Sequence, residues 1–334
     1  MSGDVQTNFS DLSCGLWRWC GRGPGVSAGP PALRHWLMIG GIGALWGANF
    51  PAVAVALEGF SPLTLAAARA SLGAVAVLGL LMLTGNWRAR LAAAARPGMR
   101  LPVLAVGVFS VGLPYALLAW GMQHVGAGFA GVTMAAVPLL VAPLAHLLVP
   151  GERLTRGRVL GVLIGFAGVV VLIGPGLWGA SGSALEDAGR LALLAAAGSF
   201  AVGAIATRLC PPIDVLALGA ASVIVAAVVL VPVALVVEGW PAAISGRVLL
   251  ALLFLGLATT AGAQLLRIRV TREVGPNFSS LTVYQVPLWA LLLSVTFLGE
   301  TVPPQLALGL VLILGGLGLA GRPDRLLAGV LRRG

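Results

Sequence analysis

The residues of this chain that could do chemistry stand singly inside long apolar runs. Asn49 follows Trp46 by about one helical turn, and Tyr284 and Gln285 lie just before a proline. Polar groups inside a bilayer are costly and usually face the interior of a helix bundle. Hydrogen-bonding and aromatic side chains in this setting suit a site that binds a small solute.

These side chains also have a structural interpretation. Asn49 follows Gly43 and Gly47, whose spacing is typical of close helix packing, so its amide could instead join two helices. Aromatic side chains suit apolar solutes, yet tyrosine and tryptophan also anchor helices at the membrane interface. The residues that we expect to line a substrate cavity are Trp46, Asn49, Tyr115, Trp120, Gln264, Tyr284 and Gln285.

Two prolines, Pro138 and Pro287, lie inside apolar runs. Proline lacks an N–H and disturbs the carbonyl group one turn earlier, so each should kink its helix and free polar backbone. A kink of this kind suits a substrate or ion site, and a purely structural bend is the alternative.

Charged or titratable residues inside or at the ends of the apolar runs are candidates for gating: Arg69, His146, Glu152, Arg267 and Glu300. Arg69 could neutralise a substrate carboxylate, although a structural strut is favoured. His146 could relay protons because histidine titrates near neutral pH, but a polar partner at the interface suits it better. The two glutamates suit capping or salt bridges, and Arg267 suits a gate or an interfacial anchor.

No motif for a metal site or for catalysis is present in the sequence. Cys14, Cys20 and Cys210 lack the spacing of metal ligands. Neither His-Glu-x-x-His nor an aspartate-rich cluster occurs, and Ser199 has only His146 as a candidate base. We therefore expect no catalytic residue, no metal and no cofactor, and an intramembrane enzyme is a distant alternative.

The composition is that of a membrane protein. The chain has 334 residues, of which 58% are hydrophobic and only 10% charged, whereas soluble domains carry about a quarter charged residues. Its net charge of +10 could suggest a nucleic-acid binder, but the arginines form short clusters between the apolar runs. The expected partners are the lipid bilayer and a small-molecule substrate, and not nucleic acid.

The apolar runs are long enough to cross the hydrocarbon as helices and lack the alternation of barrel strands. They lie near 36–57, 61–83, 101–122, 125–148, 157–174, 190–208, 214–237, 248–270, 275–298 and 304–320. Most arginines fall on one side of the membrane if both termini are cytoplasmic, which predicts that orientation in the inner membrane. Residues 1–35 and 321–334 are then cytoplasmic tails.

A duplicated pattern divides the chain into halves at 36–174 and 190–320. Gly126, Phe129, Thr133 and Pro138 match Gly275, Phe278, Thr282 and Pro287, and Gly151-Glu152 matches Gly299-Glu300. Each half has an odd number of helices, so the second must be inserted upside down. We predict an all-α membrane protein of ten transmembrane helices in two inverted five-helix repeats, an architecture of many secondary transporters.

Several short motifs in the chain also resemble those of a known protein family. Gly43–Pro51, then Ser61-Pro62-Leu63 followed by Arg69, and the two Pro…Gly-Glu blocks occur in order. Together they resemble the EamA branch of the drug/metabolite transporter superfamily. The resemblance implies a ten-helix fold with a central cavity lined mainly by helices 1, 3, 4, 6, 8 and 9, and export of amino acids, related metabolites or drugs.

The sequence therefore predicts a secondary transporter, in the simplest case an exporter, that moves small amphipathic metabolites by alternating access. A nucleotide-sugar or lipid-linked metabolite carrier is the main alternative. A diphosphate would require several cavity arginines, and only Arg69 and Arg267 are candidates. Proton coupling and a homodimer stay open.

Overall fold

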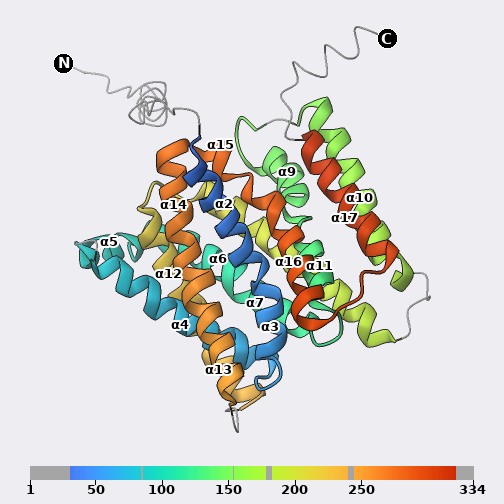
Figure 1. Cartoon of the computed structure of the whole chain (residues 1–334). Helices are drawn as coiled ribbons and strands as arrows, with labels where there is room; N and C mark the ends of the chain where they lie inside the picture. Colours follow the sequence, from blue (N-terminus) through green and yellow to red (C-terminus); the bar gives the residue numbers. More distant parts are fainter. Residues whose placement is uncertain (1–30, 84–85, 153, 178–182, 240–243, 321–334) are drawn as a thin grey trace, which may run out of the picture.

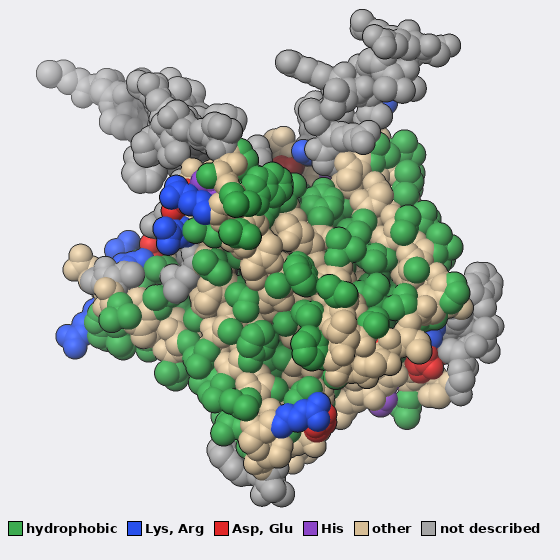
Figure 2. Space-filling view, viewed as in Figure 1, with side chains coloured by type: hydrophobic (Ala, Val, Ile, Leu, Met, Phe, Trp, Pro, Cys, Tyr) green, Lys and Arg blue, Asp and Glu red, His purple; other side chains and the backbone are tan. Residues whose placement is uncertain are grey.

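The computed structural model describes residues 31–83, 86–152, 154–177, 183–239 and 244–320, and the regular structure in these ranges is helical. Apolar side chains cover the middle of the molecule, and charged side chains gather at its rims (Figure 2). Lipid cannot hydrate charge, so this distribution fits a body that lies in a bilayer.

Seven helical stretches are long and apolar enough to cross a membrane. They are α2–α3 (Leu33–Gly47, Asn49–Ala56), α4 (Pro62–Leu83), α6–η1–α7 (Pro97–Gly107, Val108–Gly112, Leu113–Gly121), α8–α9 (Ala127–Met134, Val137–Leu148), α10 (Arg156–Leu177), α11 (Ala184–Leu209) and α12 (Val215–Val237). The protein is therefore an α-helical membrane protein with several spans.

Three shorter apolar stretches follow, at Gly246–Gly262, Thr282–Leu298 and Pro304–Ala320. The helices of this region are α13 (Gly246–Leu253), η2 (Phe254–Gly262), α14 (Ala263–Val274), α15 (Pro276–Ser279), α16 (Thr282–Leu298) and α17 (Pro304–Ala320). Figure 1 shows the start of α2 and the end of α17 at the same end of the molecule.

Polar residues move some helix ends away from the predicted runs. α11 begins at Ala184 and not near residue 190, because the Ser183 hydroxyl accepts the Glu186 N–H and acidic side chains suit a helix N-terminus. The short helix α5 (Trp87–Ala94) was not predicted at all. Its arginines exclude it from a search for apolar runs, although its alanines favour helix.

Two composite helices contain a π-helical segment. η1 joins α6 to α7, η2 joins α13 to α14, and each π segment ends on a glycine, Gly112 or Gly262. A π turn changes the backbone partners of the residues around it and is frequent at functional sites. Hydropathy does not detect it, because the composition of the helix stays apolar.

The two predicted proline kinks differ in detail. α8 ends at Met134 and α9 begins at Val137, so the helix is interrupted just before Pro138. Pro287 lies inside α16, and the interruption preceding it falls at residues 280–281, between α15 and α16. The break near Pro287 is therefore further upstream than the loss of one N–H predicts.

Two pairs of long helices pack closely against each other. α10 packs along α17, and α4 packs along α12; Figure 1 shows α10 and α17 side by side at one edge. A Cβ atom on Gly161 or Gly316 would collide with the backbone of the opposite helix. Glycine at these two positions lets α10 and α17 approach closely, as small residues do in membrane helix pairs.

One carboxylate joins the end of α12 to the start of α4. Glu238 accepts hydrogen bonds from the N–H groups of Leu63 (3.1 Å) and Thr64 (2.8 Å) and from the hydroxyl groups of Ser61 and Thr64. The free N–H groups of a helix N-terminus favour an anion. Partial burial alone would raise the pKa of Glu238, but these hydrogen bonds outweigh it and hold the pKa below its ordinary value.

Replacing this carboxylate should make stability less sensitive to acid. Because the pKa of Glu238 is lower in the folded state, its contribution is complete above the unfolded value of about 4.3 and is lost as the pH falls through the folded value. Glu238→Gln should cost about 1–2 kcal/mol at pH 7. Thermal unfolding of the purified protein between pH 7 and pH 3 checks this, since the difference in Tm should close in acid. A constant difference would contradict it.

Candidate functional site

A polar cluster lies in the interior where α2, α4, α7 and η2 meet; we define this central cluster as Trp46, Arg69, Tyr115 and Thr259. The Trp46 indole N–H donates to the Thr259 carbonyl at 3.2 Å, and an Arg69 terminal nitrogen lies 3.5 Å from the Thr259 hydroxyl. Arg69 and Thr259 are 7% and 4% exposed. The structure thus brings together three residues that the sequence singled out, with one that it did not.

The Arg69 guanidinium lacks a full set of partners for its charge and its N–H groups. Its guanidinium carbon lies 3.9 Å from the centre of the Tyr115 ring, which gives a cation–π contact. Its Nε atom is buried and has no hydrogen-bond partner among the described residues. A buried charge is costly unless it is paired and hydrogen-bonded. Arg69 therefore has unused capacity to bind an anion.

The described carboxylates lie at or near helix ends, where they have other partners. Glu58 pairs with Arg247, Glu152 with Arg208, Glu186 with Arg190, Asp214 with Arg90 and Glu273 with His35 and Arg269, while Glu238 and Glu300 bind backbone N–H groups. Asp187 lies beside Glu186 in the first turn of α11. No ion pair joins any of these acids to Arg69.

Thr259 shapes the cluster through the π segment η2. Its hydroxyl donates to the Leu255 carbonyl at 2.7 Å, and the Thr260 hydroxyl donates to the same carbonyl at 3.0 Å. The Thr259 hydroxyl has thus given its only proton and is left to accept from Arg69. Nothing in the sequence distinguishes Thr259 from other threonines, which is why it was missed.

A second cation borders the central cluster. The guanidinium carbon of Arg267, in α14, lies 5.8 Å from the centre of the Trp46 ring. The Arg267 side chain is exposed, unlike that of Arg69. The Trp46 indole therefore makes two contacts: its N–H donates to the backbone of η2, and its ring faces the exposed Arg267.

Other predicted cavity residues contact different helices. Asn49, the first residue of α3, is 9% exposed, and its buried Oδ1 has no partner among the described residues. Tyr284 donates its hydroxyl proton to the Leu317 carbonyl of α17 at 3.2 Å. Gln285 instead lies against Gly43 of α2. Neighbouring residues of α16 thus contact two different helices, α17 and α2.

Trp120 and His146 lie away from the central cluster. Trp120 is 38% exposed, and its ring packs edge-on against His124 at 4.9 Å. His146 is exposed, and its Nδ1 atom lies 3.2 Å from the Glu152 carbonyl oxygen. The backbone of Gln264 belongs to α14, but its side chain lies outside the described part of the chain.

The two matching glutamates have different partners. Glu300 accepts from the N–H groups of Ala127 (2.7 Å) and Gly128 (2.8 Å), so it caps α8. Glu152 instead pairs with Arg208 at 2.5 Å. Both glutamates follow a glycine with positive φ, +86° at Gly151 and +66° at Gly299. The local turn is therefore alike, while the contact that each carboxylate makes is not.

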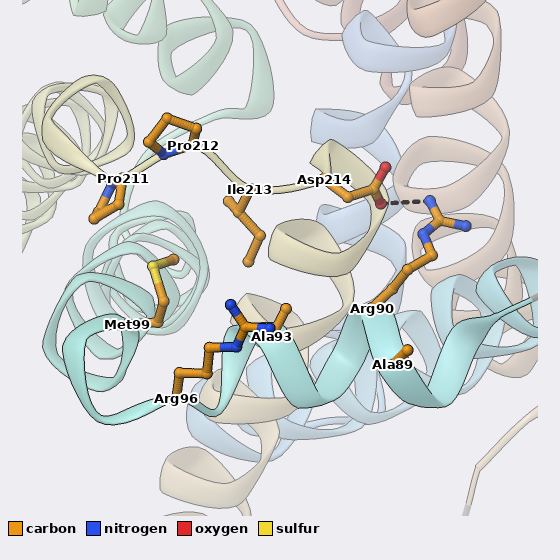
Figure 3. A pocket seen from close by; sticks show the side chains of 9 residues that line it. All are labelled: Ala89, Arg90, Ala93, Arg96, Met99, Pro211, Pro212, Ile213 and Asp214. Carbon is orange, nitrogen blue, oxygen red and sulfur yellow. Dashed lines mark hydrogen bonds and ion pairs between the residues drawn. The ribbon is translucent and has the colours of Figure 1, made fainter. Parts of the chain in front are cut away.

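A separate cavity of about 470 Å³ lies between α5, α6 and the segment before α12. Arg90 pairs with Asp214 at one side of it, and Arg96 points into it beside Met99 (Figure 3). The side chains at this cavity come from helix ends and a surface helix. In the described residues, no group of three or more His, Cys, Asp or Glu side chains could hold a metal ion.

The family model of the EamA-like transporter family matches residues 35–174 and again residues 188–322. The chain belongs to this family. The resemblance inferred from the short motifs is thereby confirmed, and the chain is a transporter of the EamA, drug/metabolite type.

Relatives of this EamA protein carry transporter names. A probable terminal-alkyne amino-acid exporter of Streptantibioticus cattleyicolor is 30% identical over 83% of this chain and 88% of its own. The uncharacterized transporter YdfC of Bacillus subtilis is 29% identical over 85% and 89%. An uncharacterized transporter of Archaeoglobus fulgidus is 26% identical over 43% of this chain and 49% of its own length. These names describe transporters and not enzymes.

A solved crystal structure shares the fold. It is 22% identical to this EamA protein, with a TM-score of 0.61, and the match covers 87% of this chain and 97% of the other. The similarity supports the arrangement of helices around the central cluster.

The ring beneath Arg69 should matter more than the hydroxyl of Tyr115. Tyr115→Phe keeps an aromatic face under the guanidinium, so its Tm should stay within about 2 °C of the wild type. Tyr115→Leu removes the cation–π contact, which is worth about 2 kcal/mol when desolvated, and should lower Tm by several degrees. Thermal unfolding in detergent checks this, and equal Tm values for the two variants would show that Tyr115 does not support the buried cation.

Proposed function

We propose that the protein is a secondary transporter that exports small amphipathic metabolites such as amino acids by alternating access. The observation that carries the proposal is the central cluster, where a buried and incompletely paired Arg69 lies inside an EamA-family helix bundle. A polar group at this depth in a membrane protein is a candidate for solute recognition.

The proposed architecture has ten transmembrane helices in two inverted five-helix repeats, at 36–174 and 190–320. The three shorter apolar stretches then cross the membrane together with the seven longer ones. Four features support it: the double match to the family model, the π segment in each half, the paired packing of α10–α17 and α4–α12, and the matching glycine turns before the glutamates. Solute would bind between the halves.

The orientation that we propose places both termini in the cytoplasm and the protein in the inner membrane. Arg90, Arg96 and Arg208 then lie on the cytoplasmic side, as the positive-inside rule favours. Glu300 lies at the outer end, where it holds α16 to the start of α8 through two backbone hydrogen bonds. Glu152 lies at the cytoplasmic end and has exposed arginine partners. Since exposed ion pairs contribute little, the cytoplasmic end is the easier one to open.

The substrate class rests on the relative's name and on the cluster itself. One relative is named as an amino-acid exporter. Aromatic side chains beside a cation suit an amphipathic solute with an anionic group. A nucleotide sugar fits less well, because Arg69 is the one buried arginine of the cluster and a diphosphate needs several cationic donors.

A transport assay tests this proposal. Protein reconstituted in proteoliposomes should exchange amino acids in a counterflow panel that also holds drugs and nucleotide sugars, with and without a pH gradient. Asn49→Ala should raise KM by about fivefold without loss of expression, because a hydrogen bond to the solute contributes about 1 kcal/mol. Thr296→Ala, which removes an exposed hydroxyl bonded within α16, is the matched control. Normal flux in Asn49→Ala would exclude this residue from the site.

Cysteine labelling tests the inverted repeat. Pro150 and Thr301 are exposed and lie beside Glu152 and Glu300, so single cysteines there should report each end without removing either carboxylate. In a background that lacks Cys14, Cys20 and Cys210, an impermeant maleimide should label Thr301→Cys from outside the cell. Pro150→Cys should react only after the membrane is opened. Labelling of both positions from one side would contradict the antiparallel arrangement.

A further inference from the structure

We infer that the central cluster is a carboxylate subsite in which Arg69 binds the carboxylate of the transported solute, so that amides and esters of the same solute are rejected. This inference rests on the proposed transport function and adds the one anionic group that the solute must carry. It follows from the depth of Arg69, from its unused donors and from the way in which its neighbours hold it.

The depth of Arg69 makes its charge costly without an anion. Arg69 lies about 10 Å along α4 from Pro62, at 1.5 Å per residue, and is 7% exposed. Several arginines at the rims have acidic partners, as Arg90 has Asp214 and Arg208 has Glu152. Arg69 has no such partner among the described residues. A charge inside a membrane protein is usually paired, so a solute carboxylate is the natural counter-ion.

The hydrogen bonds that Arg69 lacks are those that a carboxylate accepts. A guanidinium has five N–H donors in a planar fork, and the described contacts of Arg69 are a 3.5 Å approach to the Thr259 hydroxyl and the ring and hydroxyl of Tyr115. The Nε atom, which forms one side of the fork, is buried without a partner. Two parallel N–H groups of such a fork match the two oxygens of a carboxylate.

The neighbours of Arg69 hold it in place without neutralising it. Thr259 and Tyr115 are uncharged, and the Trp46 indole N–H is already bonded to the Thr259 carbonyl. The Tyr115 ring packs against the face of the guanidinium and so restricts its orientation. The N–H groups at the edges of the guanidinium stay available for hydrogen bonding. A structural strut would instead bond to an acidic partner on a second helix, as Arg90 of α5 does with Asp214 at the start of α12.

Acid and amide forms of one solute test the inference in the wild-type protein. In the counterflow assay, the amino acid that the transport panel identifies should compete at least tenfold better than its carboxamide, because the amide leaves the Arg69 charge unneutralised. Equal competition by acid and amide would overturn the Arg69 assignment and leave the transport function standing. Failure of every solute in the panel would overturn the transport function itself, and the inference with it.

Substitution of Arg69 locates the selectivity. Arg69→Gln removes the charge and keeps hydrogen-bond donors, so it should weaken the acid at least tenfold, change the amide less than threefold and thus abolish the preference. Arg69→Lys keeps the charge and should keep part of the preference. A strut predicts an equal loss for acid and amide in both variants, and that result would overturn the assignment. If Arg69→Gln does not fold, the Arg69→Lys and wild-type comparisons still decide.

Discussion

A charge inside lipid has to be compensated, and this constraint accounts for where the polar groups of the protein lie. Acidic side chains in the described chain stand at helix ends, where arginines or free N–H groups bind them. Arg69 differs from these charged groups, because it is buried in the central cluster and its guanidinium lies over an aromatic ring. The surrounding side chains stabilise the Arg69 charge only in part. Under the proposed function, the carboxylate of a bound solute would supply the missing counter-charge.

The helices around Arg69 show how such a site is held. The start of α4 is fixed by Glu238, which binds its first N–H groups, and the Arg90–Asp214 pair joins the following helix, α5, to the start of α12. η2 presents Thr259 as a hydrogen-bond acceptor because the Thr259 hydroxyl has already donated to Leu255. Trp46 ties α2 to η2 through the Thr259 carbonyl. The contacts of the cluster are therefore present without a solute, which would lower the cost of the binding that we propose.

Much of the fold could be predicted from the sequence, because lipid imposes length and polarity on each helix. The family, the helical class and most helix positions followed from apolar runs and repeated motifs. α5 and the start of α11 were missed or misplaced, since Arg88, Glu186 and Asp187 are too polar for a hydropathy search. The π segments were invisible, because the hydrogen-bond register of a helix leaves no trace in its composition.

The site could be predicted only in part. Trp46, Arg69 and Tyr115 stood out as polar or aromatic residues in apolar runs, and the structure brings them together. Trp120 had the same signature but lies on the surface against His124, because periodicity alone does not tell which face of a helix meets lipid. Thr259 and the His35–Glu273 contact depend on pairings more than two hundred residues apart. A single sequence does not contain such information.

The most direct measurement of the central claim is an experimental structure of the protein with a transported amino acid bound. The account predicts that both carboxylate oxygens lie about 2.8 Å from nitrogen atoms of the Arg69 guanidinium, with the ring of Tyr115 still beneath it. A solute bound elsewhere, with the Arg69 Nε atom still unpaired, would contradict the account.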